Sequence, residues 1–286
     1  MAGGRIGDMD NLVFLKLGGS LITDKTQPFT PRLDKLLQVA SEIKSALFGD
    51  PGLKLVLGHG SGSFGHYAVK EQSALLDLPP FSPKKSGENR KSYWEGFSEV
   101  WFRASQLNRF VMEALNKAAI PAISLAPSAM VNAQNGIITH WDLSALQSAL
   151  KVGLVPVIYG DIVFDEVRGG VVLSTETLLL YLAHQLPLKH VLLAGLEAAV
   201  WADFPIRRQI VGKITPSTFN SISSKLGGSH GVDVTGGMRS KVEEMLRLVQ
   251  QIPSLSIQIF SGEEVGNVEK ALRGDLLGTL IAGDKV

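Results

Sequence analysis

The sequence contains no cysteine, which excludes disulfide bonds, thiolate metal sites and cysteine nucleophiles. No apolar run approaches the roughly 20 residues that a membrane-spanning helix needs, so no membrane association is expected. The formal net charge is +1 at pH 7, and charge therefore gives no support to a nucleic-acid-binding role. Residues 1–11 lack the apolar segment of a signal peptide and predict a flexible tail. Together these absences predict a soluble, cytoplasmic protein.

The composition allows a large folded core. The chain has 286 residues, of which 45% are apolar and 19% charged, enough for one large α/β domain or two lobes that share a sheet. Strand-like and helix-like segments alternate, which is typical of a mostly parallel sheet with helices on both faces. We expect one domain over residues 12–286, with lobes 12–160 and 161–286. The expected strands are residues 12–17, 53–57, 120–125, 154–159, 190–194, 256–260 and 276–281, and the expected helices include residues 31–48, 93–118, 142–151 and 176–185.

Glycine-rich turns follow the first two strands directly. The first turn reads Lys16-Leu17-Gly18-Gly19-Ser20, and the second reads His59-Gly60-Ser61-Gly62-Ser63-Phe64-Gly65-His66. A third, Asp233-Val234-Thr235-Gly236-Gly237-Met238, opens an amphipathic helix that carries Lys241. Such turns expose backbone N–H groups, and the N-terminus of a following helix favours an anion. Three phosphate-sized turns with nearby lysines predict phosphoryl transfer.

Other glycine motifs do not fit these turns. The sequence has no Gly-x-x-x-x-Gly-Lys-Ser/Thr string of a Walker loop, and no Gly-x-Gly-x-x-Gly string follows the first strand. The segment Gly58-His59-Gly60-Ser61-Gly62 has glycine where a nucleophile elbow has serine, so hydrolase chemistry is not indicated.

Five charged or titratable residues near the turns are candidates for function, each with an alternative. Lys16 interrupts an apolar strand, where a buried lysine needs an anion; the alternative is an edge strand with this lysine in water. Lys25 follows the same turn, where a lysine is usually only solvated. His59 could simply bond to the backbone, whereas we expect His66 to contact a bound phosphate. Asp161 ends a strand and could hold the lysines in place, or be an ordinary turn aspartate.

An aromatic stripe marks the expected helix 93–118. Tyr93, Phe97, Val100, Trp101 and Ala104 recur at helical spacing. Most such stripes pack into the core, but part of this one could form the wall of an apolar pocket beside a phosphate site. A substrate with an apolar body and a phosphate head would suit that pocket.

Taken in order, these motifs resemble the isopentenyl phosphate kinases, a branch of the amino acid kinase superfamily. The resemblance covers about residue 12 to the end of the chain. The Lys-x-Gly-Gly-Ser start is shared widely in the superfamily, while Gly-Ser-Phe-Gly-His with the extension Thr23-Asp24-Lys25 is more specific to this branch. It implies a three-layer α/β/α fold, an N-terminal lobe for isopentenyl phosphate, a C-terminal lobe for ATP, Mg²⁺ as cofactor and a homodimer. The implied activity is ATP-dependent formation of isopentenyl diphosphate, in isoprenoid biosynthesis by the alternate mevalonate pathway.

The resemblance also implies roles for single residues. Lys16 and Lys241 would act on the nucleotide phosphates, Lys25 would stabilise the transition state, His66 would bind the substrate phosphate, and Asp161 would orient the lysines. Further substrate contacts are implied for Ser61, Gly160, Phe97 and Val100, and ATP contacts for Gly18, Gly19, Ser20, Gly62, Gly236 and Gly237.

The sequence departs from the family pattern in two places. Where many relatives carry Thr-Asp-Val-Asp-Gly-Val-Tyr, this chain has Gly195-Leu196-Glu197-Ala198-Ala199-Val200-Trp201, and a common Ser-Gly-Asp appears as Ser174-Thr175-Glu176. Two alternatives therefore stay open. One is a kinase of the same fold that acts on a phosphonate such as fosfomycin or on a carboxylate. The other is a nucleotide-binding module without turnover, which the presence of all three lysines disfavours.

Overall fold

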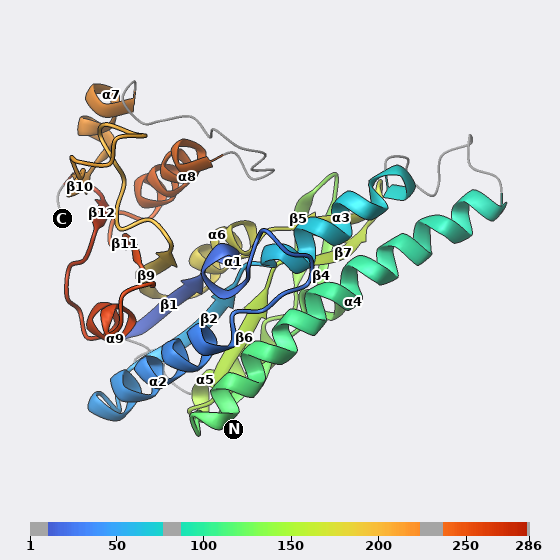
Figure 1. The fold of residues 1–286 in the computed structure, drawn as a ribbon, viewed down its shortest axis with the longest axis horizontal. Helices are drawn as coiled ribbons and strands as arrows, with labels where there is room; N and C mark the ends of the chain where they lie inside the picture. The colour runs from blue at the N-terminus through green and yellow to red at the C-terminus, as the bar shows by residue number, and fades with distance from the viewer. Residues whose placement is uncertain (1–10, 77–86, 224–236, 285–286) are drawn as a thin grey trace, which may run out of the picture.

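The computed structural model describes residues 11–76, 87–223 and 237–284 (Figure 1). Most of the expected tail, most of the loop 77–92 and the third glycine turn up to Gly236 lie outside the described residues. The helices are α1 (Gly19–Ile22), α2 (Leu33–Gly49), α3 (Gly62–Leu76), α4 (Gly87–Lys117), α5 (Ser144–Lys151), α6 (Thr175–Gln185), α7 (Pro216–Ser223), α8 (Gly237–Gln251) and α9 (Asn267–Leu272). The strands are β1 (Leu12–Leu17), β2 (Lys54–His59), β3 (Ala122–Ser124), β4 (Val131–Gln134), β5 (Ile137–Trp141), β6 (Val155–Tyr159), β7 (Asp161–Asp165), β8 (Gly169–Leu173), β9 (Leu188–Gly195), β10 (Lys213–Ile214), β11 (Ser256–Ser261) and β12 (Thr279–Ala282).

An eight-stranded sheet forms the centre of the molecule, in the order β10-β12-β11-β9-β1-β2-β6-β3. All its neighbouring pairs are parallel except β11 with β12. The chain first adds β2 on one side of β1 and later adds β9 on the other. In open parallel sheets, ligands bind at the carboxyl ends of the strands where the order reverses in this way. The first glycine turn lies at that point.

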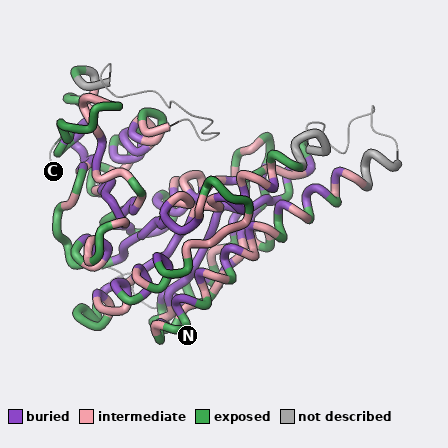
Figure 2. The backbone as a smooth tube through the Cα atoms, viewed as in Figure 1, coloured by how far each residue is buried: buried purple, intermediate pink, exposed green. Residues whose placement is uncertain are grey.

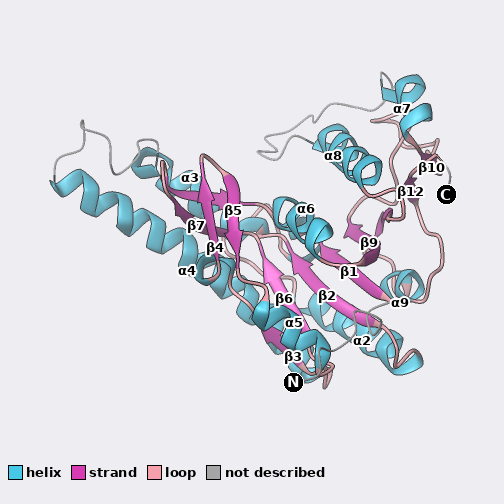
Figure 3. Ribbon diagram, turned by 180° about the vertical axis from the view of Figure 1, so that it is seen from behind, coloured by secondary structure: helices cyan, strands magenta, loops and turns pink. Residues whose placement is uncertain are grey.

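The alternation of side chains along β1 explains the layers. Leu12 and Phe14 pack in one core with α5, α6 and α8, whereas Val13, Leu15 and Leu17 pack in a second core with α2, α3, α4 and α9. Figure 2 shows the sheet as the buried centre of the molecule, and Figure 3 shows α5 and α6 in front of it. The expected three-layer α/β/α fold with a mostly parallel sheet is confirmed.

A second, four-stranded sheet, in the order β5-β4-β7-β8, was not expected from the sequence. One buried side chain fastens its turns: the carboxylate of Asp165 accepts hydrogen bonds from four backbone N–H groups, which belong to Asn135, Gly136, Val167 and Arg168. Because β7 pairs with both β4 and β8, residues 161–173 belong with the first half of the chain. A lobe boundary at residue 160 separates strands that pair with each other.

Helix α4 is the longest described helix, with 31 residues. It begins at Gly87 rather than at the expected Tyr93. The sequence does not indicate this earlier start, because the first turns of the helix extend beyond the sheet (Figure 1) and carry no apolar periodicity. Among the helices in the described parts of the chain, none is long and apolar enough to cross a membrane.

Candidate active site

The two glycine turns touch each other through their backbones at the carboxyl ends of β1 and β2. A Cβ atom on Gly19 would lie 2.6 Å from the Cα of Gly62, and one on Gly60 would lie 2.9 Å from the Gly19 nitrogen. Gly62 also has a φ of +51°, a left-handed conformation that favours glycine. These glycines are therefore required by close backbone approach, and the approach puts two sets of backbone N–H groups side by side.

The hydroxyl of Thr23 joins the two turns. It donates a hydrogen bond to the carbonyl oxygen of Gly19 at 2.8 Å and accepts one from the Ser63 nitrogen at 2.9 Å, and the residue is buried. Thr23 therefore fixes the first turn to the start of α3. Sequence reasoning gave this residue no role, because the motif alone does not say that it spans two turns.

Lys16 lies on the face of β1 that also carries Leu12 and Phe14, and it is only 6% exposed. Its ammonium group forms an ion pair with Glu176, in the first turn of α6. The same carboxylate oxygen lies 3.7 Å from the Nζ atom of Lys241 on α8. The alternative of an edge strand with Lys16 in water is wrong, and a single carboxylate gathers two of the three predicted lysines.

The charges in this cluster shift one another. Burial would raise the pKa of Glu176, but the two lysines outweigh it and bring that pKa down to about 2. Burial lowers the pKa of Lys16; Glu176 opposes this shift and Lys241 adds to it. Glu244, one turn beyond Lys241 on α8, has a raised pKa because of its burial and the nearby charge of Glu176. Glu176 is therefore ionised at neutral pH and holds two cations where an anionic ligand can meet them.

Asp161 does not form the ion pairs that the sequence predicted for it. Its buried carboxylate accepts hydrogen bonds from the backbone nitrogens of Ser128, at 3.1 Å, and Ile162, at 2.9 Å. Burial raises its pKa to about 6. Asp161 lies just beyond the end of β6, and β2 separates β6 from β1, so the strand before Asp161 is roughly 10 Å from the strand of Lys16. Glu176 takes the orienting position instead, since α6 returns over the sheet to the end of β1.

The two histidines differ in environment. The ring of His59 is fully buried, stacks on Tyr159 with centroids 5.4 Å apart, and has Asn108 3.2 Å from its Nε2 atom. Burial lowers its pKa, so this ring is neutral, and its Nδ1 atom lies 3.1 Å from the Gly60 carbonyl. His66 is half-buried, one turn into α3 beyond Gly62, with its ring edge-on to Tyr67. Its contact with a substrate phosphate stays a prediction.

Phe97 and Val100 are buried in a small apolar cluster with Ala68 of α3 and Ile162 of β7. The ring of Phe97 stacks on Phe164 with centroids 5.0 Å apart. The cluster therefore lies between the helix that carries His66, helix α4 and the second sheet. It is packed as it stands, and its role as the wall of a substrate pocket stays a prediction.

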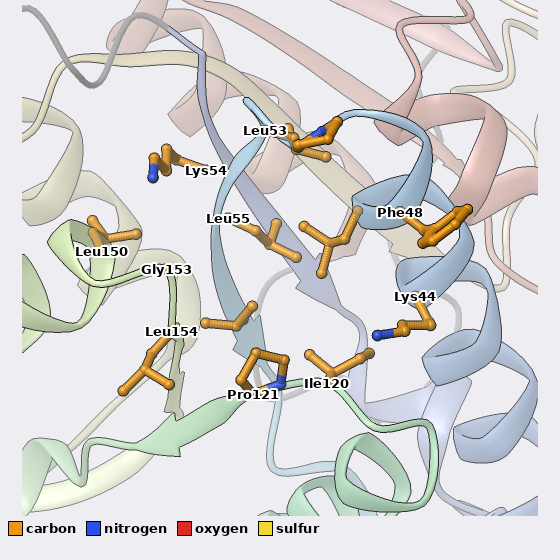
Figure 4. Close-up of a pocket in the computed structure, with 13 residues that line it drawn as sticks. Lys44, Phe48, Leu53, Lys54, Leu55, Ile120, Pro121, Leu150, Gly153 and Leu154 are labelled. Carbon is orange, nitrogen blue, oxygen red and sulfur yellow. The ribbon is translucent and has the colours of Figure 1, made fainter.

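A hollow of about 250 Å³ lies at the other end of the sheet. It is lined by residues at the amino ends of β2, β3 and β6, and Figure 4 shows Lys44, Phe48, Leu53 and Leu154 around it. The Nζ atom of Lys44 is bonded to the carbonyl of Ala119 at 3.0 Å. This hollow is remote from the glycine turns and takes no part in the site.

The atypical stretch 195–201 follows β9, beside the first glycine turn. The carboxylate of Glu197 accepts a hydrogen bond from the Trp201 indole at 2.8 Å and two from the Arg207 guanidinium at 2.7 and 3.1 Å. The carboxylate of Glu197 therefore stabilises its own loop. Gly237, which starts α8 with a φ of +72°, is described, whereas Gly236 lies outside the described residues.

The described residues provide no protein cage for a metal ion. No group of three or more His, Asp or Glu side chains within them is placed to hold one. The carboxylate nearest the lysines, that of Glu176, is occupied by two ion pairs. A magnesium ion that is carried by the phosphates of a nucleotide and by water needs no such cage.

Comparisons with known proteins agree with this geometry. The model of the amino acid kinase family matches residues 11–261. An isopentenyl phosphate kinase of Methanocaldococcus jannaschii is 34% identical over 94% of this chain and 98% of its own length, and that of Methanothermobacter thermautotrophicus is 33% identical over 95% and 99%. A solved isopentenyl phosphate kinase superposes with a TM-score of 0.75 at 30% identity, over 94% of this chain and all of that one. A product complex of the Thermoplasma acidophilum enzyme shares the fold, with a TM-score of 0.70 at 22% identity over 94% of this chain and 99% of that one. The chain belongs to the amino acid kinase family.

Proposed function

We propose that this protein is a kinase that transfers the γ-phosphoryl group of MgATP to isopentenyl phosphate and so forms isopentenyl diphosphate. One observation carries the proposal. Two glycine turns contact each other through their backbones, and the cluster of Lys16, Glu176 and Lys241 lies at the same end of the sheet. Transfer of a phosphoryl group from ATP to a second phosphate requires two phosphate-binding turns that lie next to each other. The similarity to isopentenyl phosphate kinases supports this acceptor.

The chemistry needs no general base, because the acceptor phosphate is already an anion. Its oxygen forms the new bond to the γ-phosphorus while the bond to the β,γ-bridging oxygen breaks and ADP leaves. Catalysis then rests on positioning and charge neutralisation. Lys16 and Lys241, held by Glu176, act on the nucleotide phosphates, and the exposed Lys25 acts on the transferring group. Mg²⁺ enters as part of the MgATP substrate.

The remaining contacts follow from position. We place the acceptor phosphate at the N-terminus of α3, where His66, the Ser61 backbone and Gly160 can contact it. The isopentenyl chain points towards Phe97 and Val100. The nucleotide lies over the first turn and the start of α8, with contacts from Gly18, Gly19, Ser20, Gly62, Gly236 and Gly237. These assignments extend the geometry described above to a bound substrate.

A coupled ADP-release assay tests the proposal. The acceptors to compare are isopentenyl phosphate, dimethylallyl phosphate, fosfomycin, N-acetylglutamate and UMP. Isopentenyl phosphate should give the highest kcat/KM, with dimethylallyl phosphate close behind. A higher kcat/KM with UMP, fosfomycin or N-acetylglutamate would show that the acceptor is wrong, and no ADP release with any of them would favour a binding module.

The proposal includes a homodimer and a cytoplasmic location. The edge strand β3 exposes Ile123, and α4, which packs on β3, exposes Trp101 and Phe102. An exposed strand edge with apolar neighbours supports pairing with a second copy. Light scattering on the purified protein measures the mass in solution, and a monomer at micromolar concentration would refute the dimer.

A further inference from the structure

Phe29 has a backbone conformation that a bulky side chain rarely adopts. Its φ is +52°, in the left-handed region. A residue stays in such a conformation only where its surroundings hold it there. Phe29 belongs to the loop of residues 24–30 that follows the first glycine turn and carries Lys25.

The surroundings of the Phe29 ring come from two helices. The guanidinium carbon of Arg103, on α4, lies 4.1 Å from the centre of the ring. Two rings of α3, those of Phe64 and Tyr67, meet it edge-on with centroids 6.0 and 6.4 Å away. The guanidinium is itself held, because its Nε atom donates to Glu99 at 2.7 Å. An arginine that stacks on an aromatic face offers a planar cation, which a lysine cannot replace.

The same loop is tied down at both ends. The Asp24 nitrogen donates to the Thr30 carbonyl at 2.9 Å, and the Thr30 nitrogen donates to the Ser63 hydroxyl at 3.3 Å. Between these ends, Lys25 is exposed, and the hydroxyl of Tyr67 lies 3.5 Å from its carbonyl oxygen. The same hydroxyl lies 3.5 Å from the Thr26 carbonyl oxygen, and the ring of Phe29 adds the contact that joins the loop to both α3 and α4.

We propose that Arg103 and Phe29 are positioning residues, which hold the loop of Lys25 against α3 so that its ammonium group reaches the transferring phosphoryl group. The inference rests on the proposed function for the role of Lys25. Neither residue touches substrate in this view. The ring of Phe29 also packs against the cluster of Phe97 and Val100, so the anchor continues into the region assigned to the isopentenyl chain.

Two variants test the anchor, and a third is the matched control. Arg103→Ala removes the cation, and Phe29→Asn removes the ring but keeps a residue that tolerates a positive φ. Arg109→Ala is the control, because Arg109 lies on the same helix with a similar i,i+4 partner but has a side chain 79% exposed, against 27% for Arg103. With MgATP and isopentenyl phosphate, the first two should lower kcat about tenfold to a hundredfold with little change in the KM for ATP. The control should keep the wild-type kcat.

The double variant distinguishes positioning from general damage. Once Lys25→Ala has removed the ammonium group, adding Arg103→Ala should cause almost no further loss of kcat, because residues that act through one another are not additive. A further loss as large as that of Arg103→Ala alone would overturn the inference.

A second readout does not depend on the reaction. Endoproteinase Lys-C cleaves after Lys25, and mass spectrometry can follow that one bond in the native protein. Arg103→Ala and Phe29→Asn should speed the cleavage, whereas Arg109→Ala should not. If the two variants are cleaved faster but the wild-type protein does not phosphorylate isopentenyl phosphate, the anchoring role is supported and the proposed function is refuted. Unchanged cleavage and unchanged kcat in an active kinase would remove the anchor alone.

Discussion

Replacement of Glu176 by glutamine removes the charge that Lys16 and Lys241 share and nearly preserves the shape of the side chain. Because the pKa of Glu176 is about 2 in the folded protein against an ordinary 4.5, the carboxylate is ionised in both states at neutral pH. The interval between these values corresponds to ~3 kcal/mol of stability at pH 7. A lowered carboxyl pKa gives stability that is complete above about pH 4.5 and is lost as the pH falls towards 2. Loss of one partner of a buried ion pair typically costs about 3–5 kcal/mol, which agrees.

Urea unfolding at pH 7 measures this loss, and turnover measures its consequence. We expect Glu176→Gln to lower the free energy of unfolding by about 3 kcal/mol. We also expect kcat to fall by about 10²–10³, because two ammonium groups that face each other without a shared anion move apart. Saturating MgATP should restore part of the stability, since the nucleotide phosphates replace the missing charge.

The matched comparison is Asp161→Asn, at the position that the sequence predicts to orient the lysines. An asparagine oxygen can still accept a hydrogen bond from the Ser128 nitrogen, so this variant should retain most of the turnover. If Asp161→Asn abolished turnover while Glu176→Gln kept both turnover and stability, the assignment of Glu176 would be refuted.

Three further predictions concern the same region. Burial raises the pKa of Asp161 from 3.8 to about 6, so its neutral form is favoured in the folded protein. Its contribution to the free energy of unfolding should therefore decline by ~3 kcal/mol as the pH rises from about 4 to 6. Urea unfolding over this pH range should show that decline in the wild type but not in Asp161→Asn, and the same pH dependence in both proteins would contradict it. His66→Ala should raise the KM for isopentenyl phosphate about tenfold to a hundredfold through loss of a charge-assisted hydrogen bond, with the KM for ATP nearly constant, and equal increases in both would place His66 elsewhere. Phe97→Ala should raise the kcat/KM for geranyl phosphate relative to that for isopentenyl phosphate, because removal of the ring at the end of the proposed isopentenyl pocket makes room for a longer chain and each buried CH₂ contributes about 0.8 kcal/mol. A lower melting temperature with an unchanged ratio would show that Phe97 is only a core residue.

The sequence predicts those parts of the site that depend on neighbours along the chain. The apolar run of β1 with Lys16 near its end and the glycine turns after β1 and β2 follow from local pattern. The need of a buried Lys16 for an anion also follows from the sequence, and the structure meets it with Glu176. These features are decided within about ten residues, where periodicity and turn chemistry are informative.

The missed features depend on long-range packing. The choice between Glu176 and Asp161 requires the order of the strands, because both follow a strand and only one returns to the end of β1. The contact of Arg103 with Phe29 joins residues from different helices and loops, and nothing local marks it. The second sheet consists of short strands with mixed polarity, whose pairing is set by tertiary contacts rather than by propensity.

The backbone contact between Gly19 and Gly62 has a consequence for how such an enzyme can change. In the proposed reaction, the distance between donor and acceptor phosphates would be set by the backbone contact of the two turns, which has no side-chain rotamers that could change it. The apolar cluster on α3 and α4, by contrast, consists of side chains that can be exchanged one at a time. Under the proposed function, the phosphoryl transfer and the range of substrates would depend on separate parts of the fold, so that substitutions in the apolar cluster would change the accepted chain length while the distance between the two phosphates stays the same.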